Sequence, residues 1–329
     1  MPLPPRLAAH AAAQGGPFTT AQARAVGYDD RAVYRRIRSG EWARLRRGIY
    51  IERFLLPDDE RSRHLLQLRA VRLCLQSPLV ASHSTSAALQ QIATIGADYS
   101  VVHITRDGTG SSRTEAGVCH HAAALPGSHL TKVDSLLATS AARTALDLAR
   151  TQRFEAGLVA AESALNMGLT TIAELREVLL YCLDWPGARD AGRVVGFASP
   201  HSESAGESVA RIAFDVLGLP PPDQQVDLYD DFGFIARSDF FWKLYRTVCE
   251  FDGRLKYVGD GVDPETLYKE KRREDRLRAA GAEVFRIDWA ESWSRSDSIR
   301  RKTLGAFERA AQSRVRPTLR FRLRPADGE

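Results

Sequence analysis

The sequence has few cysteines and no long apolar run. These two features argue against a disulfide-rich protein and against a membrane-spanning one. No stretch approaches the roughly 18 consecutive apolar residues that a membrane span needs. The N-terminus has one arginine and a short alanine-rich run but no long leucine-rich segment, so it predicts a first helix rather than a signal peptide. The four cysteines are widely spaced and form no Cys-x-x-Cys pair, which is typical of reduced thiols. We therefore expect a cytoplasmic protein without a membrane segment.

Length and composition predict a soluble protein with more than one domain. At 329 residues the chain is too long for one ordinary hydrophobic core, so we expect two or three domains. Its hydrophobic fraction of 44% and charged fraction of 26% are typical of globular proteins and exclude wholesale disorder. The net charge of +5 is modest, and its distribution along the chain is more informative.

Arginine is concentrated in two segments. Residues 31–47 contain seven arginines and the single acid Glu41, and the tail RVRPTLRFRLR contains five arginines and no acid. Such clusters attract polyanions because binding releases counterions. A single charge run is usually a solvated surface, but these clusters coincide with structural signals, so we favour nucleic acid as the partner.

The first 55 residues have the local signals of two short helices and a hairpin. Thr19 or Thr20 can cap a helix that ends at Gly27, and the aspartates at 29–30 can cap a second helix, RAVYRRIR. The following EWARLRRGIYI alternates and contains a turn glycine, as a β-hairpin does. This order predicts a helix-turn-helix followed by a wing.

The second of these helices has an apolar face and a basic face. Val33 and Ile37 lie four residues apart and, with Ala32, would face the core, whereas the arginines and the tyrosine of the helix share the other face. That is the shape of a recognition helix that enters the major groove while wing arginines contact phosphates. The alternative is a small helical domain with a solvated charged face. The DNA-contacting residues predicted for this module are Arg31, Tyr34, Arg35, Arg38, Arg44, Arg46 and Arg47.

The segment TTAQARAVGYDDRAVYRRIRSGEWARLRRGIY resembles the winged-helix antitoxin domain of type IV abortive-infection (AbiEi) systems. In these domains a helix-turn-helix precedes a basic hairpin that ends in Gly-Ile-Tyr or Gly-Val-Tyr. The resemblance covers about 35 residues and a looser extension, and it implies DNA binding, often at the protein's own promoter. A cognate toxin is a possible partner that the motif does not identify.

Residues 56–195 predict a mixed α/β scaffold. RSRHLLQLRAVRLCL has the pattern of an amphipathic helix, YSVVHITR and AGVCHHAA have that of strands, and three further helical segments follow. The run LATSAARTALDLA and the segment after it also resemble the middle portion of many AbiEi-type proteins. We expect this region to act as a scaffold, or as a platform for a toxin or for self-association.

Three features of this middle region resemble catalytic or metal sites, and we interpret all three as structural. His83 is flanked by serines, but no Gly-x-Ser-x-Gly elbow accompanies it. Cys119, His120 and His121 are adjacent on a predicted strand, so they cannot all face one ion. Asp147 lies in an apolar helical run, where Arg143 at i−4 is the simplest partner.

The C-terminal region, residues 196–315, has an informative order of elements. A helix over HSESAGESVARIAFDVLGLP precedes three successive strands, DQQVDLYD, FIARSDFFW and RTVCEFD. A long charged helix, a fourth strand and a last helix follow. The order α-β-β-β-α-β-α is that of the restriction-endonuclease core, although order alone does not fix function.

Acidic residues in these strands suggest a metal site. Asp239 lies in an apolar-aromatic strand, and Glu250 and Asp252 are two residues apart and therefore share a face. Three carboxylates in a small volume repel one another unless a cation intervenes, and hard oxygen ligands suit Mg²⁺ or Mn²⁺. Glu207 on the preceding helix can add a fourth carboxylate, and Lys256 would continue the same face if the strand ran past Gly253.

The stretches SAGESVARIAF, SDFFW, CEFDGRLKY and EKRREDRLRAAGAEVFRIDW resemble a nuclease-like domain similar to very-short-patch repair endonucleases. The match spans about 95 residues, and it implies Glu207, Asp239 and Glu250 as metal-site acids. Asp252 replaces the lysine of the family's Glu-x-Lys pattern, so either Lys256 has taken over or the site is altered. Lys269, Lys271, Arg273 and Arg286 are the residues of this domain predicted to contact DNA phosphates; the last two can instead brace the core.

These inferences predict an α+β multidomain protein with four segments: a winged helix-turn-helix (1–55), the middle region (56–195), an αβββαβ restriction-endonuclease-like core (196–315) and a basic tail (316–329). Two functions remain open. The first is a Mg²⁺- or Mn²⁺-dependent DNA endonuclease in defence or repair, with Asp239, Glu250, Asp252 and Lys256 as catalytic residues and Glu207 as a further metal ligand. The second is an antitoxin-like repressor whose C-terminal domain is catalytically inactive. Convergence of the acids favours the first, and arginines filling their pocket favour the second.

Overall fold

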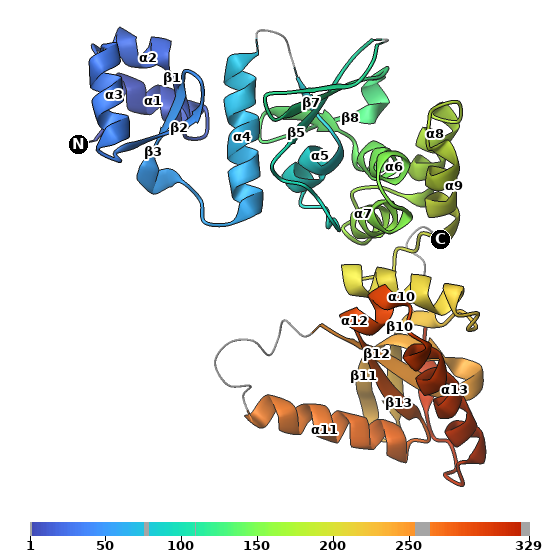
Figure 1. Ribbon diagram of the computed structural model, residues 1–329. Helices are drawn as coiled ribbons and strands as arrows, with labels where there is room; N and C mark the ends of the chain where they lie inside the picture. The colour runs from blue at the N-terminus through green and yellow to red at the C-terminus, as the bar shows by residue number, and fades with distance from the viewer. Residues whose placement is uncertain (1, 76–78, 109, 254–263, 324–329) are drawn as a thin grey trace. The chain divides into compact units, whose positions relative to one another are not determined.

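The computed structural model describes residues 2–75, 79–108, 110–253 and 264–323, apart from the side chains of 264, 266 and 267. The chain forms two compact units, Met1–Gln152 with Ala173–Ala191, and Arg153–Ile172 with Gly192–Glu329. Their described strands form three sheets, so the predicted mixed α/β multidomain class is confirmed (Figure 1). No described helix is long and apolar enough to cross a membrane.

The N-terminal part of the first unit is a three-helix domain with a small sheet. Its strands have the order β1-β3-β2 and are antiparallel, and its core contains Phe18, Val33 and Trp42. This arrangement is consistent with the predicted winged helix. The elements are α1 (Pro5–Ala13), β1 (Phe18–Thr19), α2 (Thr20–Ala25), α3 (Asp30–Arg38), β2 (Trp42–Arg46) and β3 (Ile49–Glu52).

Local capping explains where the two helices of the predicted helix-turn-helix begin. The Thr19 hydroxyl accepts a hydrogen bond from the Gln22 backbone, and the Gln22 side chain accepts one from the Thr19 backbone N–H, which forms a capping box. The Asp29 carboxylate caps α3 by accepting from the Ala32 backbone at 2.7 Å. Gly27, between the two helices, has φ +96°, a conformation that favours glycine.

The rest of the first unit is built on a six-stranded mixed sheet. Its order is β6-β7-β5-β4-β9-β8, and the pairs β5–β7 and β4–β9 are parallel. Its strands are β4 (Val80–Ala81), β5 (Val102–Arg106), β6 (Arg113–Glu115), β7 (Val118–Ala122), β8 (Leu130–Val133) and β9 (Leu136–Thr139). Its helices are α4 (Glu60–Cys74), α5 (His83–Gln90), α6 (Ala141–Thr151) and α8 (Ile172–Tyr181), while α9 (Ala188–Phe197) is shared with the second unit.

The second unit has a five-stranded sheet in the order β13-β12-β11-β10-β14. Only the β12–β13 pair among these is parallel. Its elements are α7 (Phe154–Asn166), α10 (Ala205–Val216), β10 (Asp223–Asp230), β11 (Gly233–Trp242), β12 (Thr247–Asp252), α11 (Pro264–Ala279), β13 (Glu283–Asp288), α12 (Trp289–Ser294), α13 (Asp297–Gln312) and β14 (Arg320–Arg322). The predicted order of elements from α10 to β13 is found. Part of the predicted basic tail forms the edge strand β14.

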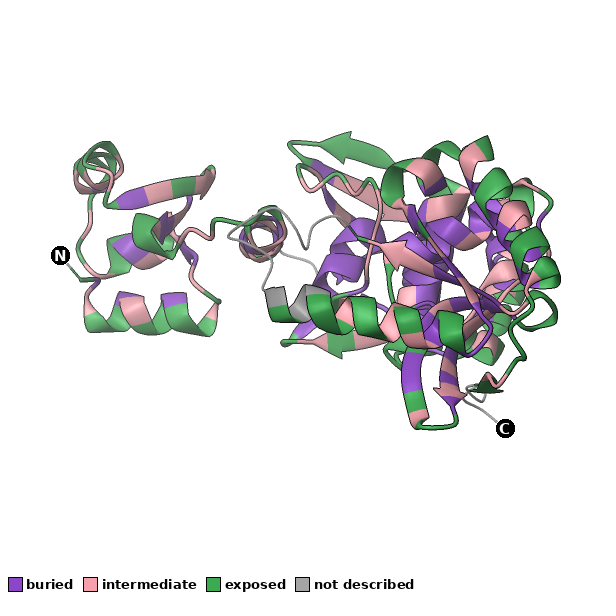
Figure 2. Ribbon diagram, turned by 90° about the horizontal axis from the view of Figure 1, so that it is seen from below, coloured by how far each residue is buried: buried purple, intermediate pink, exposed green. Residues whose placement is uncertain are grey.

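Two apolar cores cover the two faces of this sheet. Residues of α10 and α13, such as Phe214 and Phe307, pack on one face with Phe240. Leu277 of α11 packs on the other face with Phe241. Neighbouring residues of β11 therefore enter opposite cores, as strand alternation requires. In Figure 2 the buried residues lie on the sheets and the inner sides of helices, and the exposed residues lie on the outer sides.

We predict that Gly206→Ala destabilises the second unit. Gly206 lies in the first turn of α10, and an added Cβ would come within 2.1 Å of the Phe251 ring on β12. Overpacking of this kind costs about 1–3 kcal/mol, which corresponds to a fall in the thermal midpoint of about 2–4 °C per kcal/mol. The control is Gly196→Ala in α9, where a Cβ would meet nothing within 4 Å. Equal midpoints for the two variants would contradict the close packing of α10 on β12.

Candidate nucleic-acid interface and carboxylate cluster

Helix α3 has the two faces that its sequence predicts. Val33 is buried and Ile37 packs against the same core. On the other side, Arg31, Arg35 and Arg38 are exposed, and Tyr34 is 60% exposed. The helix therefore presents a continuous stripe of three guanidinium groups and one phenol, while DNA contact by these residues stays a prediction.

The arginines of this stripe differ from their neighbours in having no counter-ion. Arg24 forms an ion pair with Asp30, and Arg36 forms one with Glu41. Among the described residues, Arg31, Arg35 and Arg38 form no ion pair. Their positive charge is thus available to a polyanion.

The wing carries two exposed arginines and a third whose side chain is hydrogen-bonded within the protein. Arg44 and Arg47 are exposed on the β2–β3 hairpin, whose turn includes Gly48 at φ +78°. Arg46 is half-buried and donates a hydrogen bond to the backbone carbonyl of Ala116. Of the three predicted phosphate contacts in the wing, Arg44 and Arg47 are the better placed.

In the second unit, two arginines donate hydrogen bonds to Glu250, a carboxylate that the predicted metal site requires. Glu250 on β12 lies opposite Arg286 in the parallel register with β13. Its Oε2 accepts from Arg286 Nε at 3.3 Å, and its Oε1 accepts from an Arg273 guanidinium nitrogen at 3.0 Å. Arg286 also pairs with Glu274 at 3.0 Å. Arg273 and Arg286, predicted to contact DNA, therefore brace this carboxylate in the structure.

Unlike Glu250, the carboxylates of Asp239 and Glu207 form no ion pair with an arginine among the described residues. Asp239 Oδ2 accepts from the Phe251 backbone at 2.7 Å, just beyond the last paired residues of β11 and β12, Phe240 and Cys249. Burial raises the pKa of Asp239, and the charge of Glu250 raises it further. Glu207 is 6% exposed, and burial followed by repulsion from Asp239 raises its pKa to about 7.

The remaining predicted residues of this site are dispersed. Asp252 is half-buried at the end of β12, opposite Asp288, which caps α12. Lys269 pairs with Glu265 on the surface of α11, and Lys271 is exposed. The predicted catalytic Lys256 lies outside the described residues.

The acids do not fit a divalent cation in this arrangement. Both oxygens of Glu250 already accept from guanidinium groups. Within the described residues, the three ligand atoms found within 4.8 Å of one another belong to histidines of the first unit rather than to these acids. Binding of Mg²⁺ or Mn²⁺ by Glu207, Asp239, Glu250 and Asp252 therefore stays a hypothesis to be tested by experiment.

The middle region contains one ion pair that the sequence predicted and one cluster that it did not. Asp147 accepts from Arg143 Nε at 2.8 Å, as expected for an i−4 partner, and from Arg150 at 2.9 Å. His83 and His121, which we interpreted as structural, lie beside His103, which the sequence analysis did not single out. No local sequence pattern marks this cluster, because successive histidines are 20 and 18 residues apart. His103 and His121 come together through the pairing of β5 with β7.

Comparisons with known proteins support the predicted resemblance of the N-terminal domain to AbiEi antitoxins. Residues 5–52 match the family described as "Transcriptional regulator, AbiEi antitoxin". This match spans α1 to β3 and confirms the resemblance of that segment to AbiEi antitoxin regulators. The resemblance of the C-terminal region to very-short-patch repair endonucleases stays a prediction.

Two uncharacterized proteins of Mycobacterium tuberculosis also match, MT2308 of strain CDC 1551 and Rv2248 of strain H37Rv. Each is 29% identical to this chain over 161 residues, which is 49% of this chain and 58% of the relative. The chain thus spans little more than half the length of the curated relatives that it matches. Their names assign no activity.

We predict that the stability of the second unit falls as pH rises through neutrality. The folded-state pKa of Glu207 is raised from 4.5 to about 7, so its contribution is fully present below pH 4.5 and is lost as pH rises through about 7. The stabilisation lost between pH 5 and pH 8 is about 2–3 kcal/mol at about 1.4 kcal/mol per pKa unit. Thermal unfolding at pH 5 and pH 8 should show this dependence in the wild type and a weaker one in Glu207→Gln. The same pH dependence in both proteins would refute the assignment to Glu207.

Proposed function

We propose that this protein is a DNA-binding transcriptional regulator of the antitoxin type. Its recognition helix α3 would enter the major groove, and Arg44 and Arg47 of the wing would contact flanking phosphates. The observation that carries the proposal is the stripe of exposed arginines without counter-ions on α3. The match of residues 5–52 to AbiEi antitoxin regulators supports it independently.

Duplex DNA is the partner that the free arginines best fit. Three of the four arginines of α3, at positions 31, 35 and 38, lie along one side of two helical turns. Guanidinium groups can bind phosphate or the guanine edge in a bidentate manner, and Tyr34 adds a polar group between them. We expect binding to depend strongly on salt, because every neutralised phosphate releases counterions.

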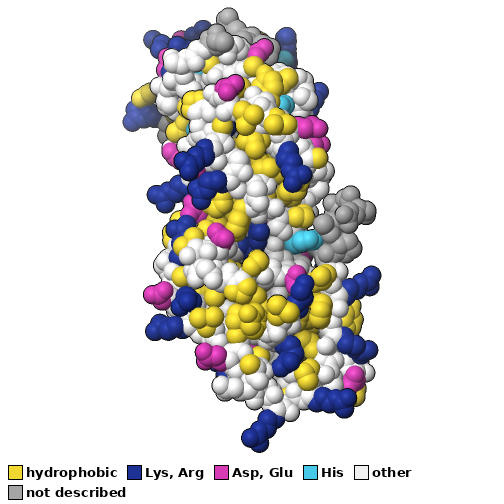
Figure 3. All heavy atoms as spheres, turned by 90° about the vertical axis from the view of Figure 1, so that its right-hand side faces the viewer, with side chains coloured by type: hydrophobic (Ala, Val, Ile, Leu, Met, Phe, Trp, Pro, Cys, Tyr) yellow, Lys and Arg dark blue, Asp and Glu magenta, His cyan; other side chains and the backbone are white. Residues whose placement is uncertain are grey.

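A cognate toxin, or a second copy bound through the middle region, completes the antitoxin proposal. Apolar side chains at the end of α8 support a protein-interaction role, since Leu180, Tyr181 and Leu183 are 67%, 44% and 56% exposed. In the view of Figure 3, hydrophobic side chains are dispersed among lysines and arginines, and basic side chains do not gather in one patch there. The toxin's identity is left to co-purification and genetics.

We predict that the triple variant Arg31→Ala, Arg35→Ala, Arg38→Ala loses most of its DNA affinity. Each phosphate contact contributes about 0.9 to the slope of log K against log salt concentration, so the slope should fall by about 2–3. Fluorescence anisotropy with labelled duplex DNA at several KCl concentrations measures both quantities. The charge-matched control replaces the exposed Arg176, Arg300 and Arg301 outside this domain and should keep the wild-type slope. Unchanged affinity and slope in the α3 variant would disprove the proposed interface.

A metal-dependent endonuclease is the second candidate. Two observations favour it: the order of elements from α10 to β13, and the raised pKa values of Glu207 and Asp239. Burial raises both pKa values most, and repulsion from Asp239 and from Glu250, respectively, raises them further. The arginines on Glu250 weigh against it, because Mg²⁺ or Mn²⁺ would have to compete with two guanidinium groups for that carboxylate. We therefore place the regulator first.

Plasmid cleavage separates the two candidates. If the C-terminal domain is catalytically inactive, supercoiled plasmid should remain intact after incubation with the wild type and Mg²⁺ or Mn²⁺, at salt concentrations where the protein binds DNA. The matched samples are Glu250→Ala and the wild type with a chelator. Nicking by the wild type that both the chelator and Glu250→Ala abolish would establish the nuclease and displace the inactive-domain hypothesis.

A further inference from the structure

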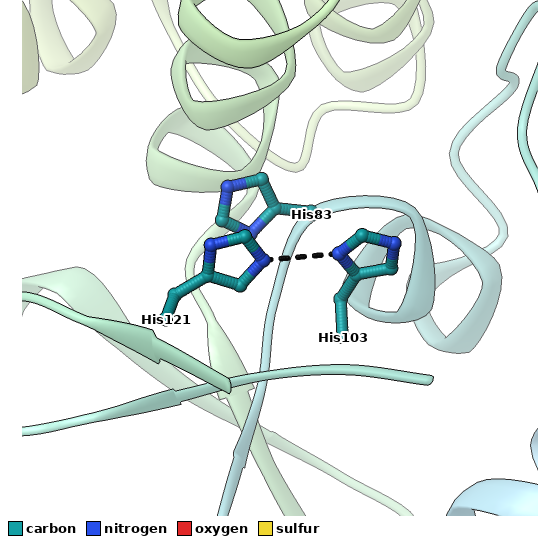
Figure 4. Close-up of side chains that lie close together, drawn as sticks. All are labelled: His83, His103 and His121. Carbon is teal, nitrogen blue, oxygen red and sulfur yellow. Dashed lines mark hydrogen bonds between the residues drawn. The ribbon is translucent and has the colours of Figure 1, made fainter. Parts of the chain in front are cut away.

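Three histidines from separate elements meet in the first unit. His83 is the first residue of α5, His103 lies in β5 and His121 lies in β7 (Figure 4). One ring nitrogen from each lies within 4.8 Å of the other two. His103 Nδ1 and His121 Nε2 are 3.0 Å apart, and the rings of His83 and His121 stack with centroids 3.8 Å apart.

The sheet topology places these imidazoles together. In the parallel register of β5 and β7, His103 lies opposite Cys119 and Thr105 opposite His121, so His103 and His121 share a face of the sheet. The short strand β4 pairs on the other side of β5, and the chain then turns directly into α5 at His83. His120 falls on the opposite face of β7, as alternation requires.

His83 holds its position in an unfavourable backbone conformation. Its φ is +51°, in the left-handed region that non-glycine residues rarely adopt. Such conformations cost on the order of 1–3 kcal/mol and persist where the surroundings fix them, often at functional sites. His83 Nδ1 lies 3.0 Å from the Ser82 hydroxyl, which leaves Nε2 as the nitrogen without that contact.

Burial of the three imidazoles favours their neutral form. Burial lowers the pKa of His83 well below its usual value, lowers that of His103 to about 4 and lowers that of His121. The neutral imidazole, with its lone pair free, is the form that binds a metal ion. Burial therefore favours the form of each imidazole that can bind a metal ion.

A pocket of about 600 Å³ opens onto the cluster. His83 and His121 line it, together with Asp147 and its two arginine partners. Thr105 also lines it, and the Thr105 hydroxyl is buried with no hydrogen-bond partner among the described residues. A polar group left without a partner beside a cavity indicates a site that holds a ligand or water.

We propose that His83, His103 and His121 bind a divalent transition-metal ion of the Zn²⁺ type, with the pocket providing access to its open coordination position. Imidazole nitrogens suit Zn²⁺, and three histidines with one open position are a recurring metal-site pattern. Ligands of a tetrahedral Zn²⁺ are separated by about 3.4 Å, given Zn–N distances of about 2.0–2.1 Å. The one His103–His121 separation is 3.0 Å, and one nitrogen from each of the three rings lies within 4.8 Å of the other two, so side-chain movements of about 1 Å would bring them to this spacing.

Nearby charges are compatible with a cation at this site. Arg143 and Arg150 oppose it, but both pair with Asp147, whose carboxylate offsets part of their charge. The alternative for the empty cluster is a hydrogen bond between the His103 and His121 rings, which requires no metal. Metal titration therefore distinguishes the two interpretations directly.

The test uses the full-length protein without a polyhistidine tag, treated with a chelator and then dialysed. Titration calorimetry with Zn²⁺ should show a single site per chain. Co²⁺ should give the intense visible bands of a tetrahedral ion rather than the weak bands of a hydrated one. A folded wild type that binds neither ion overturns the proposal whatever the variants do.

The variants locate the site. His103→Gln and His121→Gln should each weaken Zn²⁺ binding by about 100-fold or more, since each removes one of three ligands. The matched control is His120→Gln, which alters the neighbouring residue of the same strand and should bind Zn²⁺ as the wild type does. Thermal melts confirm that each variant folds. Equal loss in His120→Gln, or retained binding in both ligand variants, places the bound ion elsewhere and refutes the proposed site.

Discussion

A carboxylate removed from water needs a counter-charge, and in this protein arginine supplies most of it. Asp147 and Glu250 each accept hydrogen bonds from two arginines, and the buried Glu162 pairs with Arg211. These internal pairs use positive charge that would otherwise face solvent. Among the described residues, Arg31, Arg35 and Arg38 of α3 form no ion pair, so their positive charge is available to a polyanion. The proposed DNA interface thus depends as much on where arginines are neutralised as on where they occur.

Local features of the fold could be predicted from the sequence because they depend on neighbouring residues. The caps Thr19 and Asp29, the apolar spacing of Val33 and Ile37, and the i−4 pair of Arg143 with Asp147 all act within one or two helical turns. The order of elements in the second unit was also predictable, since each element has its own periodicity. None of these inferences required knowledge of which strands pair.

Strand pairing decided the features that the sequence did not reveal. Glu250 meets Arg286 because β12 and β13 are parallel and in a register that aligns them across 36 residues of chain. His103 reaches His121 for the same reason, through the parallel pair β5 and β7. Neither register leaves a local pattern, because parallel strands are joined by long connections. The sequence therefore predicted a group of acids but did not identify the arginines that neutralise Glu250.

The way in which buried carboxylates are neutralised in this protein also bears on where a metal ion fits. Glu207 and Asp239 form no ion pair with an arginine among the described residues. Burial raises the pKa of both, which favours a proton in place of the missing counter-charge. Neighbouring carboxylates without a bound cation repel one another. Arginines or protons therefore neutralise them, and a metal ion must compete with these groups. Neutral imidazoles incur no such cost, and a buried histidine cluster can remain folded and unprotonated until an ion arrives. For this physical reason we assign the metal proposal to the histidines of the first unit and keep the acids of the second unit as a separate hypothesis.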